Sequence, residues 1–100
     1  MSLLDKYISQ IVKLCHQYGV KTLFAFGSVT NNKFKKDSDV DLVVDIESKD
    51  PLEYSDNYFA LKFRLEQLLK RNIDLLENKA IKNPFLKREI DQTKILIYGK

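Results

Sequence analysis

Two aspartates alternate along an apolar stretch that follows a Gly-Ser pair by ten residues, in GSVTNNKFKKDSDVDLVV, residues 27–44. Asp39 and Asp41 are two residues apart, so in a strand their carboxylates leave the same face about 7 Å apart along the backbone. Carboxylates this close repel each other unless they are protonated or share a cation. Magnesium is the natural partner, because it is a hard cation that prefers oxygen ligands. The pair therefore predicts a divalent-metal site.

A third aspartate, Asp74, lies at the centre of NIDLLE, residues 72–77, which we expect to be a strand. If this strand neighbours that of Asp39 and Asp41 and turns Asp74 to the same face, three carboxylates converge. Such a cluster suits two metal ions, which stabilise the attacking and leaving oxygens of a phosphoryl transfer. The competing interpretation is a solvated or salt-bridged strand face. Asp45 shares that face but lies about 13 Å further along, and we interpret it as a strand-end residue.

The pair Gly27-Ser28 supplies the second half of the predicted site. Glycine permits a sharp turn and lets a ligand approach the backbone closely. If one helical turn begins just after Ser28, its N–H groups and the serine hydroxyl point to one place and can bind phosphate. Metal ligands on one side and phosphate donors on the other would hold a nucleoside triphosphate between them.

The rest of the sequence predicts the elements that must position these residues. A helix opens at Ser2 and stops at Gly19, because apolar residues follow at helical spacing and glycine ends helices. Residues 29–38 are polar and basic and form a loop. Ser55 caps a long helix that runs to about Arg71, with its aromatic residues in the core or, in part, against a partner helix. The further elements are strands over 20–26, 39–46 and 72–77, a short helix from Asn83-Pro84, and a last strand or extended tail at 94–98.

This order of elements predicts an α/β (α+β) fold, a small mixed β-sheet with helices packed against it. The helix between the strands over 39–46 and 72–77 is long enough for a crossover, so those strands should be parallel neighbours. The strands over 20–26 and 39–46 are joined by a loop and can be antiparallel. With 100 residues and no linker or repeat, residues 1–100 are expected to form one domain.

Composition indicates the setting. No apolar run could span a membrane and no signal peptide is recognisable, so we expect no membrane association. Cys15, the only cysteine, excludes an internal disulfide, fits a reducing cytoplasm and is expected in the core. The net charge of +3 is concentrated after residue 75, where six basic side chains outnumber three acidic ones. A solvated basic surface is the simpler explanation and an acidic partner the alternative; nucleic-acid binding ranks last at so small a charge.

The run Gly27-Ser28, ten residues, then Asp39-Val40-Asp41 resembles the defining motif of the DNA polymerase beta-like nucleotidyltransferases. The length and the late Asp74 resemble the minimal nucleotidyltransferases (MNT), the antitoxin half of HEPN/MNT toxin–antitoxin pairs. The resemblance covers nearly the whole chain. It implies the polymerase beta-like nucleotidyltransferase fold.

The resemblance also implies residue roles. Asp39 and Asp41 would ligate two Mg²⁺ ions, and Asp74 would bind the catalytic metal and accept or orient the proton of the attacking hydroxyl. Gly27 and Ser28 would hold the triphosphate of ATP. In the family a nucleoside monophosphate passes to a hydroxyl and pyrophosphate leaves. For the minimal antitoxins this implies AMP transfer to a tyrosine of the cognate HEPN ribonuclease toxin, which blocks the nuclease.

One departure from the motif concerns the phosphate side. Many members carry an arginine directly after the Gly-Ser pair, where this sequence has Val29 and Thr30. Lys33, Lys35 or Lys36 in the loop are the candidates to replace it. Nucleotide affinity and the choice of base are therefore left undefined.

The length of the chain indicates what kind of acceptor molecule to expect. Larger relatives add a second domain that holds the acceptor, and none is visible here, so an open cleft and a macromolecular acceptor are expected. Three alternatives stay open: an antitoxin that acts by binding alone, a nucleotidyltransferase for a small molecule, and a basic nucleic-acid-binding domain. The sequence does not define the modified residue, the number of AMP groups, or whether homo- or hetero-oligomers form.

Overall fold

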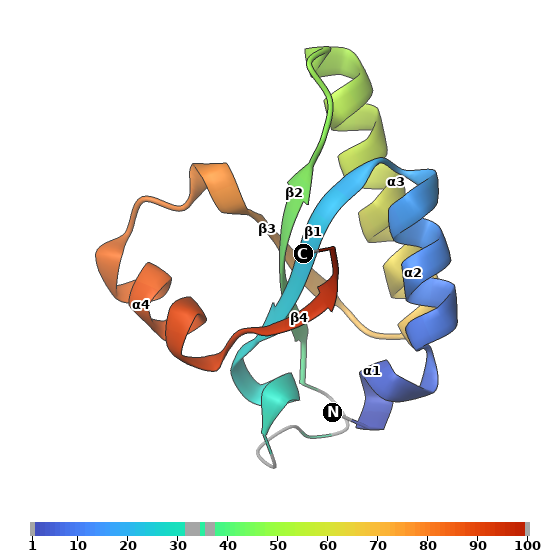
Figure 1. The fold of residues 1–100 in the computed structure, drawn as a ribbon. Coiled ribbons are helices and arrows are strands. Elements are labelled where there is room, and N and C mark those ends of the chain that lie inside the picture. Colours follow the sequence, from blue (N-terminus) through green and yellow to red (C-terminus); the bar gives the residue numbers. More distant parts are fainter. Residues whose placement is uncertain (1, 32–34, 36–37, 100) are drawn as a thin grey trace.

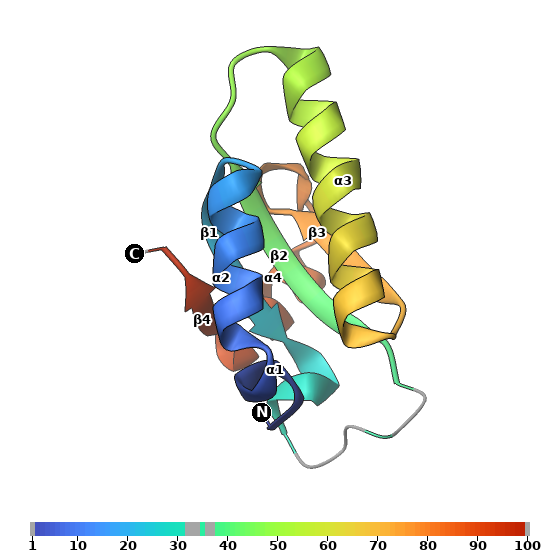
Figure 2. The same cartoon turned by 90° about the vertical axis from the view of Figure 1, so that its right-hand side faces the viewer.

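A mixed four-stranded sheet with helices on both faces forms the protein (Figures 1 and 2). The computed structural model describes residues 2–31, 35 and 38–99. The predicted fold class, a small mixed sheet with helices packed against it, is confirmed. The elements, of which η1 and η2 are 3-10 helices, are α1 (Ser2–Lys6), α2 (Ile8–Gln17), β1 (Val20–Phe26), η1 (Gly27–Thr30), β2 (Val40–Ile46), α3 (Pro51–Leu69), β3 (Ile73–Glu77), η2 (Asn78–Ala80), α4 (Pro84–Thr93) and β4 (Ile95–Tyr98).

The strands run in the order β3-β2-β1-β4. β2 and β3 are parallel, and β1 is antiparallel to both β2 and β4. The predicted parallel pairing is confirmed, because α3 connects β2 to β3 as a crossover helix (Figure 2). The stretch at 94–98, predicted as a strand or a tail, contains a strand that pairs with β1.

The two faces of the sheet are covered differently. α2 and α3 lie side by side over one face, which we call the core face, and α4 lies over part of the other, which we call the acidic face (Figures 1 and 2). Side chains of β2 alternate between them. Asp41 and Asp45 are half-buried on the acidic face, where Val43 packs with Phe26 and Ile90. The β2 side chains on the core face are all buried: Val40, Leu42, Val44 and Ile46.

Helix α3 begins at Pro51, earlier than the predicted start at Ser55. Asp50 caps it, since its carboxylate accepts the Leu52 N–H at 3.0 Å, and proline is well suited to the first turn of a helix. With 19 residues α3 is the longest described helix. Neither it nor any other helix in the described ranges is long and apolar enough to cross a membrane.

The expectation that the aromatic residues of α3 lie in the core is wrong for two of them. Phe59 and Phe63 are 63% and 56% exposed, whereas Leu61, Leu65 and Leu69 are buried. Each phenylalanine precedes a buried leucine by two positions, which is about 200° around a helix. The buried stripe of α3 is thus narrower than its apolar content suggested.

The single N-terminal helix that the sequence predicted is divided at Tyr7. The Tyr7 N–H donates to the Leu4 carbonyl three residues back at 3.1 Å, which tightens the turn there. Gly19 follows α2 with φ of +68°, as expected of a glycine that ends a helix. Cys15 lies in the core as predicted, and burial raises the pKa of its thiol to about 12.

Candidate active site

The Gly-Ser pair forms a tight corner at the end of β1. The predicted helical turn is present as η1, but it begins at Gly27 rather than after Ser28. Gly27 has φ of +73°, a conformation that other residues rarely adopt. A Cβ atom at this position would lie 2.8 Å from Oδ2 of Asp41. Glycine is therefore required both by the turn and by the close approach of this carboxylate.

Hydrogen bonds fix the corner on both sides of Gly27. Its N–H donates to Oγ1 of Thr93 in α4 at 3.3 Å, and its carbonyl accepts from Oγ1 of Thr30 at 2.6 Å. Val29, which directly follows the Gly-Ser pair, is buried. Ser28 is half-buried between these residues. The corner is therefore held by α4 as well as by its own turn.

Asp41 and Asp74 are direct neighbours across β2 and β3. They are paired in the parallel register, and neighbouring strands lie about 4.8 Å apart. Asp41 is half-buried opposite Phe26, the last residue of β1, whereas Asp74 is exposed. Asp39 is exposed and directly precedes β2, so it lies just outside the strand that it was expected to open. The backbone thus brings Asp41, Asp74 and Gly27 together.

Negative charge is concentrated around Asp41. Its pKa is raised to about 6, first by burial and then by the charges of Asp74, Asp39 and Glu89. Because each influence disfavours the ionised carboxylate, a cation at this place would be strongly favourable. Glu89 belongs to α4 and is missing from the predicted site residues. No local pattern marks it, because its approach to Asp41 depends on how α4 crosses the sheet.

The oxygen donors at this place fit Mg²⁺ chemically, since that ion prefers carboxylates and water. As the side chains stand in residues 2–31, 35 and 38–99, no three acidic, histidine or cysteine side chains form a group that could hold a metal ion. Asp39 and Asp74 are exposed, so their carboxylates can turn without movement of the strands. The three-aspartate metal site therefore stays a prediction. The backbone places the three aspartates near one another, and their side chains would have to rotate for all three carboxylates to bind the same metal site.

Arg71, in the turn between α3 and β3, anchors the chain that leads into Asp39. Its Nη1 donates to the carbonyls of Lys35 at 2.7 Å and Ser38 at 3.2 Å. Val40 N–H donates to the Asn72 carbonyl at 3.0 Å, which continues the anchor into β2. Sequence reasoning placed Arg71 only at the end of a helix and missed this role.

The lysines proposed for the phosphate side are only partly covered by the structure. Lys35 is exposed, and its carbonyl is held by Arg71. Lys33 and Lys36 lie outside the described residues. Phosphate binding by one of these three lysines stays a prediction.

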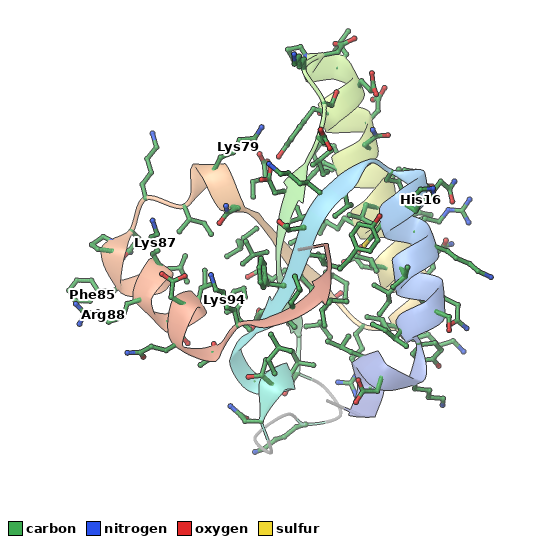
Figure 3. The ribbon with its side chains drawn as sticks, viewed as in Figure 1. His16, Lys79, Phe85, Lys87, Arg88 and Lys94 are labelled. Carbon is green, nitrogen blue, oxygen red and sulfur yellow. The ribbon has the colours of Figure 1, made fainter. Side chains whose placement is uncertain are left out.

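Basic residues of the C-terminal quarter lie on α4 and at its end: Lys87 and Arg88 belong to the helix, and Lys94 follows it. Figure 3 shows Arg88 beside Phe85 on the outer side of this helix. Lys94 forms an ion pair with Asp91 at 3.3 Å, and its Nζ lies 5.0 Å from the ring centre of Phe24. Since Phe24 packs on the acidic face of the sheet, Lys94 brings a positive charge to that face.

Residues 9–100 match the family described as polymerase beta, nucleotidyltransferase. The chain belongs to this family. Protein adenylyltransferase MntA of Thermococcus cleftensis is 33% identical to this nucleotidyltransferase over 75 residues, which cover 75% of this chain and 73% of that protein. A candidate protein adenylyltransferase of Methanocaldococcus jannaschii is 35% identical over 85 residues, covering 84% of this chain and 83% of that protein.

Solved structures share the fold. The nucleotidyltransferase matches a candidate minimal nucleotidyltransferase with a TM-score of 0.75 at 28% identity, covering 92% of this chain and 90% of that one. A chain from the structure of tri-AMPylated Shewanella oneidensis HEPN toxin in complex with MNT antitoxin matches with a TM-score of 0.67 at 17% identity, covering 96% and 72%. Two resemblances are confirmed: that to the polymerase beta-like nucleotidyltransferases, drawn from the spacing of Gly27, Ser28, Asp39 and Asp41, and that to the minimal nucleotidyltransferases, drawn from the chain length and Asp74.

Proposed function

We propose that this nucleotidyltransferase is an antitoxin that transfers AMP from ATP to a tyrosine hydroxyl of a cognate HEPN ribonuclease toxin and thereby neutralises it. The observation that carries the proposal is the pairing of Asp41 with Asp74 beside the Gly27 corner, in a chain of this family. The acceptor is supported by two relatives: MntA is named a protein adenylyltransferase, and the Shewanella complex joins an MNT antitoxin to an AMPylated HEPN toxin.

Asp39, Asp41 and Asp74 are the proposed ligands of two Mg²⁺ ions. When bound, these ions supply the positive charge that stabilises the attacking and leaving oxygens. The raised pKa of Asp41 supports this assignment. Burial and the neighbouring negative charges disfavour the ionised form of that carboxylate, and a bound cation would stabilise it. The corner at Gly27 and Ser28 is proposed to hold the triphosphate.

The reaction forms a bond between the acceptor oxygen and the α-phosphorus of ATP. The bond from that phosphorus to the oxygen bridging to the β-phosphate breaks, and pyrophosphate leaves. A free tyrosine hydroxyl has a pKa of about 10 and is protonated at neutral pH, so a positioned base assists its attack. Asp74, exposed on the edge strand β3, is proposed to orient this hydroxyl and to accept its proton.

Incubation with labelled ATP, Mg²⁺ and the cognate toxin tests the proposal. We expect label on the toxin, loss of labelling when EDTA removes the metal, and a rate at least about 100-fold lower for Asp41→Asn. Asp45→Asn is the matched control, because Asp45 lies on the same strand and face and should be dispensable. Transfer by Asp41→Asn at the wild-type rate would refute the catalytic role.

Neutralisation by binding alone is separated from catalysis by Asp74→Ala, tested in cells that express the toxin. A variant that no longer transfers label should no longer protect these cells. Protection at wild-type strength would assign the antitoxin effect to binding. Label on a small molecule of a cell extract, with none on the toxin, would assign a small-molecule acceptor.

A further inference from the structure

One hydrogen bond joins two parts of the site that are 66 residues apart in the chain. The Gly27 N–H donates to Oγ1 of Thr93, the last residue of α4. The same Oγ1 donates its proton to the Glu89 carbonyl at 2.9 Å. A hydroxyl has one proton to give and lone pairs with which to accept. The bond to Glu89 therefore leaves Thr93 as an acceptor for Gly27.

Gly27 depends on such contacts, because glycine populates positive and negative φ about equally and does not hold one conformation by itself. Its carbonyl is held by Thr30, and the absence of a side chain lets Asp41 approach its Cα. The remaining backbone group is the N–H, whose direction sets the peptide plane between Phe26 and Gly27. Thr93 is the residue that fixes that plane.

We propose that Thr93 is a positioning residue for nucleotide transfer: its hydroxyl fixes the Gly27 amide, and through it the placement of Ser28 in the corner that adjoins Asp41. The inference rests on the proposed function of the Gly-Ser corner as the triphosphate site. It also directs the Gly27 N–H to α4 instead of to the phosphates. Binding of the triphosphate then falls to Ser28 and the part of the turn that follows it.

The hydroxyl of Thr93 is separable from the packing that holds α4. Ile90 is buried against Phe26 and Val43, and Leu86 packs on the same cluster. These apolar contacts anchor α4 to the sheet whether or not residue 93 has a hydroxyl. Removing the hydroxyl should therefore disturb the corner more than the fold.

Two variants test this directly. Thr93→Val removes the hydroxyl and keeps the shape of the side chain, and Thr93→Ser keeps the hydroxyl as the matched control. Amide hydrogen exchange of Gly27, measured by NMR, should be about fivefold faster in Thr93→Val, the loss expected for one ordinary hydrogen bond, and unchanged in Thr93→Ser. Equal exchange in Thr93→Val and the wild type overturns the proposal.

The second readout is function. ATP binding in the presence of Mg²⁺, measured by calorimetry without acceptor, and the transfer rate should each fall about five- to tenfold in Thr93→Val and recover in Thr93→Ser, with equal unfolding temperatures. Unaltered binding and transfer in Thr93→Val, or an equal loss in Thr93→Ser, overturns the positioning role. If Thr93→Val does not fold, Thr93→Ala removes the same hydroxyl with a good helix former. Absence of ATP binding by the wild-type protein would refute the proposed function, whatever the hydrogen exchange of the Gly27 amide shows. Failure of the proposed function can therefore be distinguished from failure of the Thr93 proposal.

Discussion

On β2, the side chains toward α2 and α3 are hydrocarbon and fully buried, whereas those toward α4 include Asp41 and Asp45, which keep part of their surface exposed. One strand thus serves both the core face and the acidic face of the sheet. Because successive side chains of a strand point to opposite faces, neighbouring positions can be specialised independently. Adjacent residues of β2 therefore serve different purposes, one packing in the core and the next lining the candidate site. Substitutions on the core face should lower stability, and substitution of Asp41 on the acidic face should lower activity.

Leu42→Ala should give the largest loss of stability. Leu42 is 1% exposed on the core face, and truncation of a buried leucine costs about 2–5 kcal/mol through lost burial and the remaining cavity. Urea unfolding measures this cost. Asp41→Asn, one residue away on the acidic face, should leave the free energy of unfolding unchanged or raise it, because its charge is disfavoured in the native state. If both variants lose stability equally, the separation of the faces is wrong.

Gly27→Ala should damage both properties, because the corner adjoins Asp41. The left-handed φ costs an alanine about 1–2 kcal/mol, and the added Cβ would lie 2.8 Å from Oδ2 of Asp41. We expect a loss of stability of about 1–3 kcal/mol and a large loss of transfer. Gly19→Ala is the matched control: φ is +68° there, but an added Cβ would lie 3.7 Å from the Glu47 carbonyl oxygen, which is an ordinary contact distance. Gly19→Ala should lose stability and keep its activity, and a Gly19→Ala enzyme as inactive as Gly27→Ala would contradict the carboxylate clash.

Arg71→Ala should have a smaller effect, mainly on activity. It removes two hydrogen bonds to the carbonyls of Lys35 and Ser38, and so loosens the approach to Asp39. We expect transfer to fall about fivefold, as for one or two ordinary hydrogen bonds. Arg64→Ala, an exposed position of α3 on the other side of the sheet, is the control and should match the wild type. An equal decrease in both variants would point to general loss of charge.

The pH dependence of stability tests the acidic face through the charge of one carboxylate, Asp41. Asp41 has a pKa of about 6 in the folded protein, raised from its ordinary value of 3.8. Below about pH 3 the carboxyl is protonated in both states, and as pH rises through about 6 the unfolded chain ionises first, so the free energy of unfolding decreases. Above about pH 7 the carboxyl is ionised in both states and this contribution stays constant. Urea titrations of the wild type and of Asp41→Asn, both in EDTA, isolate this contribution. The difference between their free energies of unfolding should change between pH 4 and 6. A difference that is independent of pH would contradict the raised pKa.

The sequence was sufficient wherever a short pattern determines structure. The alternation around Asp41 predicted its strand and its faces, and the length of the following helix predicted the parallel pairing with Asp74. The start of α3 was misplaced because Ser55 was chosen over Asp50, although a proline after Asp50 was a helix-start signal of its own.

What could not be predicted depends on contacts between distant segments. Thr93 and Glu89 approach the corner only because α4 folds back over the acidic face, and nothing in their local sequence indicates this. Phe59 and Phe63 were expected in the core because apolar content was counted without the direction of each side chain. The closure of the three aspartates around metal is likewise a matter of side-chain rotation, which strand periodicity does not determine.

The strand order has a consequence for folding during synthesis. β1 is an inner strand, yet it is synthesised first, and its partner on one side is β4, which is completed only at Tyr98. While the chain grows on the ribosome, one backbone edge of β1 stays open beside apolar residues such as Leu23 and Phe24. Such an edge can recruit strands from other nascent chains. That edge is therefore open to aggregation until β4 has been synthesised and paired, and chaperones that bind extended apolar segments would protect it in this interval.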